Sequence, residues 1–373
     1  MKHLLFAIHY LELGGAEMSL IGLLGAIDYS QNDVDLFVYS HRGELMAAIP
    51  PQVHLLPESP MYAQIERPMV DVLKDGYLRM VWARLKAKRQ FARYRRKKHP
   101  QDGNAIFAYV ARNVTPLLPP IRPEKEYDVA VSYLAPHDIV LDKVRAKKKY
   151  AWVHTDYTMV DMNTALEFPV WNRYDVIAAV SEAVSEAFTS RFPSLRDKMV
   201  IIPNIISPAF VRERAEAFDA EPEMPREKGA VRLLSVGRFT KAKNFDNVPD
   251  ICRRIREQGF DACWYLIGFG GEEGFIRQRI AEAGMEDYVR ILGKKANPYP
   301  YMKACDIYVQ PSRYEGCPVT IQEALALGKP VIATAFPTVK SVLQDGENGH
   351  IVPLDNEGCV RGICALLSEK CLY

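Results

Sequence analysis

The sequence predicts an α/β protein with two doubly wound domains that face each other across a cleft, each built on a parallel sheet. The chain has 373 residues, 48% of them hydrophobic, which is more than one ordinary core accommodates. Short runs rich in Val and Ile alternate with helical patterns in both halves. A charged segment with three prolines, 207–230, lies between the halves and is the expected linker.

The first domain, expected over 1–206, contains five apolar runs that predict buried strands. Because helical patterns separate the runs, we expect a parallel sheet with crossover helices. A helix should begin near Ala16, soon after the first run. The expected strands are HLLFAI (3–8), YDVAVSYL (127–134), KYAWVHT (149–155), DVIAAVS (175–181) and KMVIIPN (198–204).

The second domain, expected over 231–373, repeats this scheme. Its predicted strands are VRLLSVG (231–237), ACWYLIG (262–268), YVRILG (288–293), DIYVQPS (306–312) and PVIAT (330–334). Ligands of open parallel sheets bind at the carboxyl ends of the strands. Polar residues that follow these runs are therefore the first candidates for a site.

Two glutamates, Glu315 and Glu323, have seven residues between them and flank a predicted helix start. Pro318 suits the first helical position, and Gly328 should end the helix. Glu315 then lies in the loop and Glu323 about two turns inside the helix. The free N–H groups of the first turn favour an anion, and Gly316 allows close approach. A phosphate between two hydroxyl-binding carboxylates would suit a nucleotide sugar. Alternatively, both glutamates are ordinary solvated side chains.

Two further loops follow predicted strands of the second half. The loop SVGRFTKAKNF carries Arg238 and Lys243, whose charges would neutralise a diphosphate leaving group. The alternative is a solvated basic loop. The loop LIGFGGEEGF places Gly268 directly after a strand, which by itself is a weak signal that often marks a tight turn.

Five motifs occur in the order found in glycosyltransferase family 4, and on them the chain resembles that family. They are GGAE (14–17), VGRF (236–239) followed by Lys243, LIGFGG (266–271), YEGCPVTIQEALALGKPVIA (314–333) and DGENGHIVP (345–353). The resemblance covers 231–353 well. In the first half it rests on GGAE, VHTD (153–156), AVSE (179–182) and IPN (202–204). It implies two Rossmann-like domains of the GT-B type, acceptor-side first and donor-binding second, with retaining chemistry.

The resemblance also implies roles for individual residues. Glu315 would hold hydroxyls of the transferred sugar, and His154 would face the reacting sugar, although a single strand-end histidine is more often structural. These two form the implied catalytic pair. Glu323 would bind the nucleotide ribose. The implied donor-binding set is Gly14, Gly15, Arg238, Lys243, Gly268, Gly316, Cys317, Val319, Thr320 and Glu323.

The implied activity is a retaining, metal-independent hexosyltransferase that moves a sugar from a nucleotide-diphosphate sugar, with UDP the first choice. The acceptor would be a glycan or a lipid-linked glycan in bacterial surface-polysaccharide synthesis. The sequence shows no clustered metal ligands, and no metal or cofactor is expected. Two alternatives remain: a glycoside hydrolase using Glu315 and Glu323, or a nucleotide-sugar binding protein without turnover.

A basic segment, 77–99, holds ten Lys and Arg and no acidic residue. Leu78, Val81, Trp82 and Leu85 fall on one face of a helix. The segment is either an amphipathic domain helix with a solvated basic face or a contact for anionic membrane. The cations expected at the membrane are Arg84, Lys86, Lys88, Arg89, Arg93, Arg95, Arg96, Lys97 and Lys98. No base-reading motif accompanies them, so nucleic acid is not expected.

Charge and cysteine usage bear on localisation. The formal net charge is +2, and the seven cysteines form no C-x-x-C pair. An odd number of cysteines in a large protein indicates reduced thiols. The apolar start of the chain is too short for a signal peptide. We therefore expect a cytoplasmic protein, placed peripherally on the inner face of the plasma membrane if the basic segment docks there.

Overall fold

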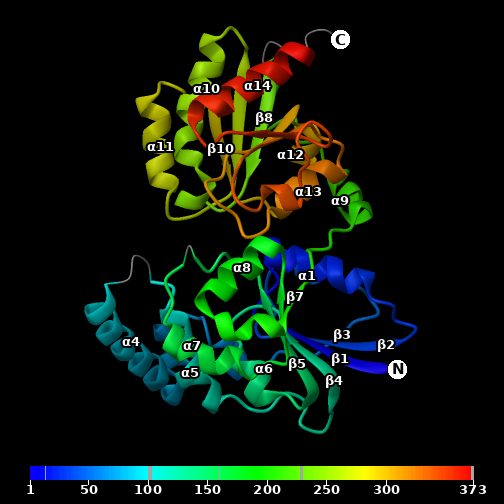
Figure 1. The fold of residues 1–373 in the computed structure, drawn as a ribbon, viewed down its shortest axis with the longest axis vertical. Coiled ribbons are helices and arrows are strands. Elements are labelled where there is room, and N and C mark those ends of the chain that lie inside the picture. Colours follow the sequence, from blue (N-terminus) through cyan, green and yellow to red (C-terminus); the bar gives the residue numbers. More distant parts are fainter. Residues whose placement is uncertain (13, 100–102, 159, 227–229, 371–373) are drawn as a thin grey trace. The chain divides into compact units, whose positions relative to one another are not determined.

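The computed structural model describes residues 1–12, 14–99, 103–158, 160–226 and 230–370. The chain divides into two compact units, Met1–Ile205 and Ile206–Tyr373 (Figure 1). Each unit contains one sheet in which all strands run parallel. The predicted fold class, α/β with two doubly wound parallel sheets, is confirmed.

The sheet of the first unit has seven strands in the order β3-β2-β1-β4-β5-β6-β7. Its strands are β1 (Lys2–Ile8), β2 (Asn32–Val38), β3 (His54–Leu55), β4 (Tyr127–Ser132), β5 (Ala146–Val153), β6 (Val176–Ala179) and β7 (Met199–Ile201). Its helices are α1 (Gly15–Ala26), α2 (Pro60–Ala63), α3 (Met69–Lys74), α4 (Leu78–Lys98), α5 (Ile106–Val114), α6 (Asp138–Lys143), α7 (Thr164–Trp171) and α8 (Glu182–Arg191). Strand order reverses between β1 and β4, which is where such sheets bind ligands.

All five strands predicted for this unit are present, and β2 and β3 were not predicted. Two aspartates, Asp33 and Asp35, interrupt the apolar pattern of β2. Asp35 is 2% exposed, and its carboxylate accepts from Lys125 Nζ at 3.1 Å and Tyr127 Oη at 2.5 Å. These partners compensate the buried charge, which is why an acidic residue is tolerated in a central strand.

The sheet of the second unit has six strands in the order β10-β9-β8-β11-β12-β13. They are β8 (Val231–Val236), β9 (Ala262–Ile267), β10 (Val289–Gly293), β11 (Ile307–Gln310), β12 (Val331–Thr334) and β13 (His350–Val352), of which β13 was not predicted. The helices are α9 (Pro208–Ala215), α10 (Val248–Glu257), α11 (Glu273–Glu282), α12 (Tyr299–Ala304), α13 (Val319–Ala326) and α14 (Asn356–Lys370). Here strand order reverses between β8 and β11.

The segment expected as a linker, 207–230, begins with helix α9, which belongs to the second unit. Arg212 Nε donates to the Ala326 carbonyl at 3.1 Å, and Asn297 Nδ2 donates to the Arg214 carbonyl at 2.6 Å. The first part of the segment is thus bonded to the second unit. Residues 227–229 lie outside the described residues.

The basic segment forms helix α4, which packs beside α5 (Figure 1). Its buried side chains are Met80, Ala87 and Phe91. Of the predicted apolar face, Val81 packs against the core, whereas Leu78 and Trp82 are 56% and 66% exposed, so that face is only partly packed. Within the described residues, no helix combines the length and apolar composition that crossing a bilayer requires.

Candidate active site

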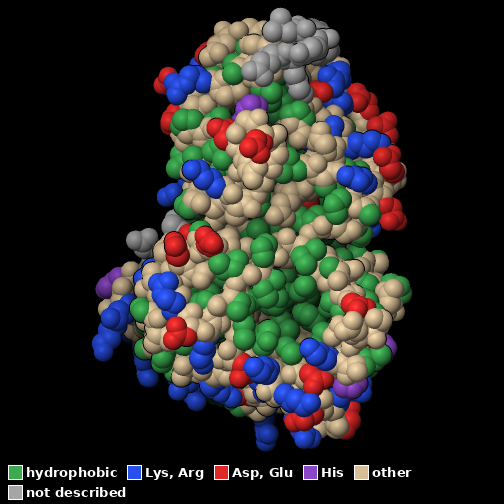
Figure 2. Space-filling view, turned by 45° about the vertical axis from the view of Figure 1, so that its right-hand side comes forward, with side chains coloured by type: hydrophobic (Ala, Val, Ile, Leu, Met, Phe, Trp, Pro, Cys, Tyr) green, Lys and Arg blue, Asp and Glu red, His purple; other side chains and the backbone are tan. Residues whose placement is uncertain are grey.

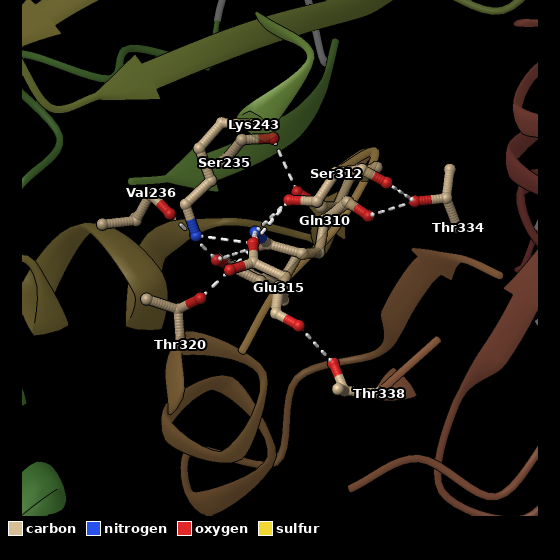
Figure 3. Close-up of polar contacts among 11 residues, drawn as sticks. Ser235, Val236, Lys243, Gln310, Ser312, Glu315, Thr320, Thr334 and Thr338 are labelled. Carbon is tan, nitrogen blue, oxygen red and sulfur yellow. Dashed lines mark hydrogen bonds and ion pairs between the residues drawn. The ribbon is translucent and has the colours of Figure 1, made fainter. Parts of the chain in front are cut away.

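The loop that leaves β11 and the start of α13 hold Glu315 in a network of donors (Figure 3). Its Oε1 accepts from Lys243 Nζ at 2.6 Å, Ser312 Oγ at 2.6 Å and Gln310 Nε2 at 2.7 Å. All three hydrogen bonds end on Oε1, and none of them involves Oε2. The Glu315 side chain is 9% exposed, so the alternative in which it is solvated is wrong.

Neighbouring threonines hold the backbone of this loop. Thr338 Oγ1 donates to the Glu315 carbonyl at 2.9 Å, and Thr334 Oγ1 donates to the Ser312 carbonyl at 2.5 Å (Figure 3). Asn244, in a left-handed conformation with φ 61°, donates from Nδ2 to the Pro311 carbonyl at 2.9 Å. These bonds tie the loop after β11 to β12 and to the loop after β8.

An ion pair joins the same two loops. The two terminal guanidinium nitrogens of Arg313 contact the Asp246 carboxylate, each at 2.8 Å. The Arg313 N–H also donates to the Ala242 carbonyl at 2.7 Å. Such bidentate pairs fix orientation as well as charge. The loops after β8 and β11 therefore form one surface at the carboxyl ends of two neighbouring strands.

Glu323 lies inside α13 and is 4% exposed, so its assignment as a surface residue is wrong. It accepts a hydrogen bond from Tyr299 Oη of α12 at 2.9 Å. Burial raises the pKa of the Glu323 carboxyl to about 7, while Tyr299 and the charge of Lys243 lower it. Near neutral pH this buried carboxyl group is present in protonated and ionised forms, so it can donate to or accept from ligand hydroxyls.

The helix start carries most of the predicted donor-binding backbone. Gly316 and Cys317 are half-buried, and Val319 is buried. The Val319 N–H donates to the Cys317 carbonyl at 3.0 Å, so that donor is occupied in this conformation. Thr320 Oγ1 donates to Gln310 Oε1 at 3.2 Å, which links the first turn of α13 to the Glu315 network (Figure 3).

Arg238 and Gly268 lie on the loops after β8 and β9. The Arg238 side chain is exposed. Gly268 has φ +153°, and a Cβ there would lie 1.9 Å from the Gly237 carbonyl oxygen. A side chain at 268 would thus force the two loops apart. This glycine has a packing role whether or not it also contacts a ligand.

His154 follows β5 in the first unit, and its ring centroid is 4.7 Å from that of Tyr133. Burial lowers its pKa to about 3, so the imidazole is neutral at pH 7. Neither ring nitrogen forms a hydrogen bond with the described part of the chain. A buried imidazole in this state has donor and acceptor capacity left for a ligand.

Gly14 and Gly15 begin helix α1, at the carboxyl end of β1. A Cβ at Gly14 would lie 2.2 Å from Glu17 Oε2, so the glycine leaves room for this carboxylate. Further along α1, Ser19 Oγ donates to Asn204 Oδ1 at 2.6 Å. Helix α1, which begins within GGAE, therefore contacts the motif IPN, although the two are far apart in sequence.

Several residues of the site were not predicted. Gln310 and Ser312 lie at the end of a predicted buried strand. Polar residues at that position could have indicated that they belong to the site. Tyr299 and Asp246 belong to no motif, and their roles follow from the positions of α12 and the loop after β8.

One group among the described residues has metal-ligand spacing: Asp33, Asp35 and His54. It lies near the amino ends of β2 and β3, the edge opposite to His154. Lys125 Nζ contacts both aspartates, at 3.0 and 3.1 Å, so their charge already has a cationic partner. This group is accounted for as a structural ion cluster.

Residues 230–369 match the family model described as glycosyl transferases group 1. The match lies within the second unit. Two curated relatives are the amylovoran biosynthesis glycosyltransferase AmsK of Erwinia amylovora, 30% identical over 145 residues, and the lipopolysaccharide core biosynthesis glycosyltransferase LpsE of Rhizobium meliloti, 28% identical over 141 residues. The matches cover 37% and 38% of this chain and 35% and 40% of the relatives, less than half of their length.

Among solved structures, the Anabaena protein Alr3699/HepE in complex with UDP and glucose superimposes with a TM-score of 0.66. The match covers 99% of this chain and 91% of that protein, at 16% identity. At this identity the likeness shows a shared fold, which is the two-unit α/β fold of GT-B glycosyltransferases.

Proposed function

We propose that this protein is a glycosyltransferase that transfers a sugar from a nucleotide-diphosphate sugar, with UDP as the first choice, to a glycan or lipid-linked acceptor. The observation that carries the proposal is the network at the start of α13, where Lys243, Glu315 and Glu323 converge beside a helix N-terminus. The names of the relatives support a place in bacterial surface-polysaccharide synthesis.

In this proposal each group takes one part of the donor. Lys243 and Arg238 bind the diphosphate, helped by the helix start. Glu315 uses its other oxygen, Oε2, for a hydroxyl of the transferred sugar. Glu323 accepts from the ribose. The ammonium of Lys243 would then stabilise the charge that develops on the departing diphosphate, a contribution of a few kcal/mol per donor.

The proposed reaction retains the anomeric configuration and needs no divalent metal. The cations at the diphosphate would do the work that a metal does in other transferases. The neutral His154 ring would accept or donate a hydrogen bond at the reacting sugar. A glycoside hydrolase is not favoured, because Glu315 is bonded to an ammonium group and every relative named above is a glycosyltransferase.

The test is a donor panel with the purified protein. Calorimetry with UDP, GDP and ADP should give tightest binding for UDP, and only nucleotide sugars should be turned over. Proton NMR of the product, taken early, should show the anomeric configuration of the donor. Cleavage of glycosides that lack a nucleotide would instead support a hydrolase, and binding without turnover would support a binding protein.

The proposal includes a peripheral position on anionic membrane through α4. At about 100° per residue, Leu78, Trp82, Arg89, Arg93 and Arg96 fall on the side of α4 opposite its buried face. Figure 2 shows Lys and Arg side chains gathered along the left edge of the first unit, where α4 lies in Figure 1. The exposed side of α4 thus begins with apolar Leu78 and Trp82 and continues with a row of arginines, an arrangement that suits a membrane surface.

Arg84 must be removed from the expected membrane contacts. Its guanidinium donates to the Gln64 and Arg67 carbonyls at 3.3 and 2.6 Å. Burial lowers its pKa, although the charge persists at neutral pH. The exposed cations of the segment are Lys86, Lys88, Arg89, Arg93, Arg95, Arg96, Lys97 and Lys98, together with Arg79.

A further inference from the structure

Helix α1 carries a buried serine in an otherwise apolar stretch. Ser19 is 1% exposed, and its neighbours Met18 and Leu20 are also buried. A buried hydroxyl costs free energy unless it forms hydrogen bonds. The Ser19 hydroxyl contacts two groups from distant parts of the first unit, the Tyr133 hydroxyl at 2.8 Å and Asn204 Oδ1 at 2.6 Å. Ser19 therefore joins the segments that follow β4 and β7 to helix α1.

The direction of these two hydrogen bonds follows from their partners. The amide oxygen of Asn204 can only accept, so the single hydroxyl proton of Ser19 points to it. The Tyr133 hydroxyl must then donate to Ser19 Oγ. Asn204 is the second-last residue of the first unit, Met1–Ile205. The Tyr133 hydroxyl is thus tied, through Ser19, to the segment with which the chain leaves this unit.

The ring of Tyr133 connects these hydrogen bonds to His154. Tyr133 is 1% exposed, and its ring centroid lies 5.1 Å from that of Trp152 and 4.7 Å from that of His154. Burial lowers the pKa of His154 to about 3, and the Tyr133 backbone partly opposes this lowering. Both ring nitrogens of His154 are buried, and neither forms a hydrogen bond with the described part of the chain. The orientation of the imidazole therefore depends on packing, in which Tyr133 takes part.

We propose that Ser19 and Tyr133 are positioning residues for His154. Ser19 holds the Tyr133 hydroxyl, this hydroxyl fixes the Tyr133 ring, and the ring sets the orientation of the imidazole. The role rests on the proposed function, in which His154 forms a hydrogen bond at the reacting sugar. A misplacement of about 1 Å can cost roughly 10²-fold in rate, so a rigid support for the imidazole affects turnover directly. The alternative is that the two hydrogen bonds serve only the stability of the first unit.

Two variants interrupt this support at different points. Tyr133→Phe keeps the aromatic ring and removes its hydroxyl, while Ser19 can still donate to Asn204. Ser19→Ala keeps Tyr133 and removes the group that holds its hydroxyl. Tyr29→Phe is the matched control, because the Tyr29 hydroxyl donates to the Leu24 carbonyl of α1 at 2.6 Å. The control thus loses a tyrosine hydrogen bond to the same helix.

NMR of protein that contains isotope-labelled histidine reports on the imidazole without any substrate. The chain has eight histidines, and the signal that disappears in His154→Gln belongs to His154. This signal should shift or broaden in Ser19→Ala, which changes no atom of Tyr133 or His154. It should stay in place in Tyr29→Phe. An unmoved His154 signal in Ser19→Ala would overturn the proposal.

Steady-state sugar transfer separates a positioning role from a purely structural one. At temperatures well below unfolding, kcat should fall roughly tenfold in Ser19→Ala and in Tyr133→Phe, while the donor KM and the affinity for UDP stay unchanged. Tyr29→Phe should keep the kcat of the parent protein. A lower melting temperature of Ser19→Ala and Tyr133→Phe with an unchanged kcat would mean a purely structural role and overturn the proposal.

The two measurements also distinguish this proposal from the proposed function. If the His154 signal responds in Ser19→Ala but the parent protein transfers no sugar, the positioning of His154 stands and the proposed function fails. If the parent protein transfers sugar and both variants match its kcat, the proposed function stands and the positioning role fails.

Discussion

The carboxylate of Glu315 and the ammonium of Lys243 lie 2.6 Å apart, although we assign them to different parts of one ligand. Both side chains are mostly buried, at 9% and 17% exposure. In the proposed complex a diphosphate would compete with Glu315 for this ammonium. The ion pair keeps both charges compensated while the site is empty, and it makes donor affinity sensitive to either partner.

Glu315→Gln and Glu323→Gln should fail differently. In the proposed complex Glu315 contacts the sugar that reacts, so its variant should lose about 10²–10³ in kcat. Because the variant also releases Lys243, UDP should bind as tightly as before or more tightly. Glu323→Gln should weaken UDP binding, since a hydrogen bond to a charged group contributes about 1.5–3 kcal/mol. Steady-state transfer and UDP titration measure both effects. The opposite pattern would reverse the assignment.

Lys243→Ala should weaken UDP binding about 10- to 100-fold, because it removes a charge-assisted hydrogen bond from the diphosphate. Lys241→Ala is the matched control, since Lys241 lies on the same loop with an exposed side chain. Calorimetry with UDP gives the two affinities. Equal affinities in both variants would remove Lys243 from the diphosphate site.

The raised pKa of Glu323 gives stability a pH dependence. Between the ordinary value of 4.5 and about 7, the folded protein holds a proton that the unfolded chain has released. Stability should therefore fall as pH rises through this window and change little above it. Urea unfolding at about pH 5 and pH 8 checks this against Glu323→Gln. The free energy of unfolding of the parent protein, relative to the variant, should be greater at the lower pH. If the free energies of unfolding of the parent protein and the variant differ by the same amount at both pH values, the raised pKa of Glu323 is contradicted. Glu167 also has a raised pKa, but it is present in both proteins, so its effect cancels.

Sugar transfer should persist in excess EDTA, because in the proposed complex Lys243, Arg238 and the helix start would supply the positive charge at the diphosphate. The measurement is the initial rate with and without chelator, after dialysis to remove loosely held ions. A rate that collapses with EDTA and returns with manganese or magnesium would mean that the site recruits a metal.

Vesicle co-sedimentation should separate two contributions of α4. Arg93→Glu should weaken binding to anionic vesicles, because each basic residue contributes about 1 kcal/mol near such a surface. Lys340→Glu, an equal charge change in the second unit, is the control and should have little effect. Trp82→Ser should remove the part of the binding that survives high salt, where charge attraction is screened. Equal binding of all proteins to neutral and anionic vesicles would contradict membrane docking.

The sequence analysis missed β2, which two aspartates interrupt, and β3 and β13, which are only two and three residues long. In β2 the buried charge of Asp35 is compensated by Lys125 and Tyr127. These residues are distant in sequence, so the local sequence pattern of β2 does not reveal the contacts. On α4, two stripes could have formed the buried face, one with Trp82 and one with Phe91. The choice depends on where α5 packs, and local periodicity does not encode that position.

For the candidate site, the sequence likewise identified individual residues but not the tertiary contacts between them. Glu315, Glu323 and Lys243 were found because motifs carry them. Their contacts were not found, because Lys243 and Glu315 are 72 positions apart and meet only through the pairing of β8 with β11. The burial of Glu323 similarly depends on Tyr299 of α12, a helix that the sequence analysis did not predict.

The Arg313–Asp246 ion pair has a consequence for how the second unit folds after synthesis. It joins segments 67 positions apart, so a nascent chain that has not reached Arg313 cannot form this contact of the proposed donor site. Nucleotide binding would then appear as an all-or-none property during refolding. In hydrogen exchange, the Arg313 amide, bonded to Ala242, should gain protection at the same moment as the first UDP-binding molecules appear.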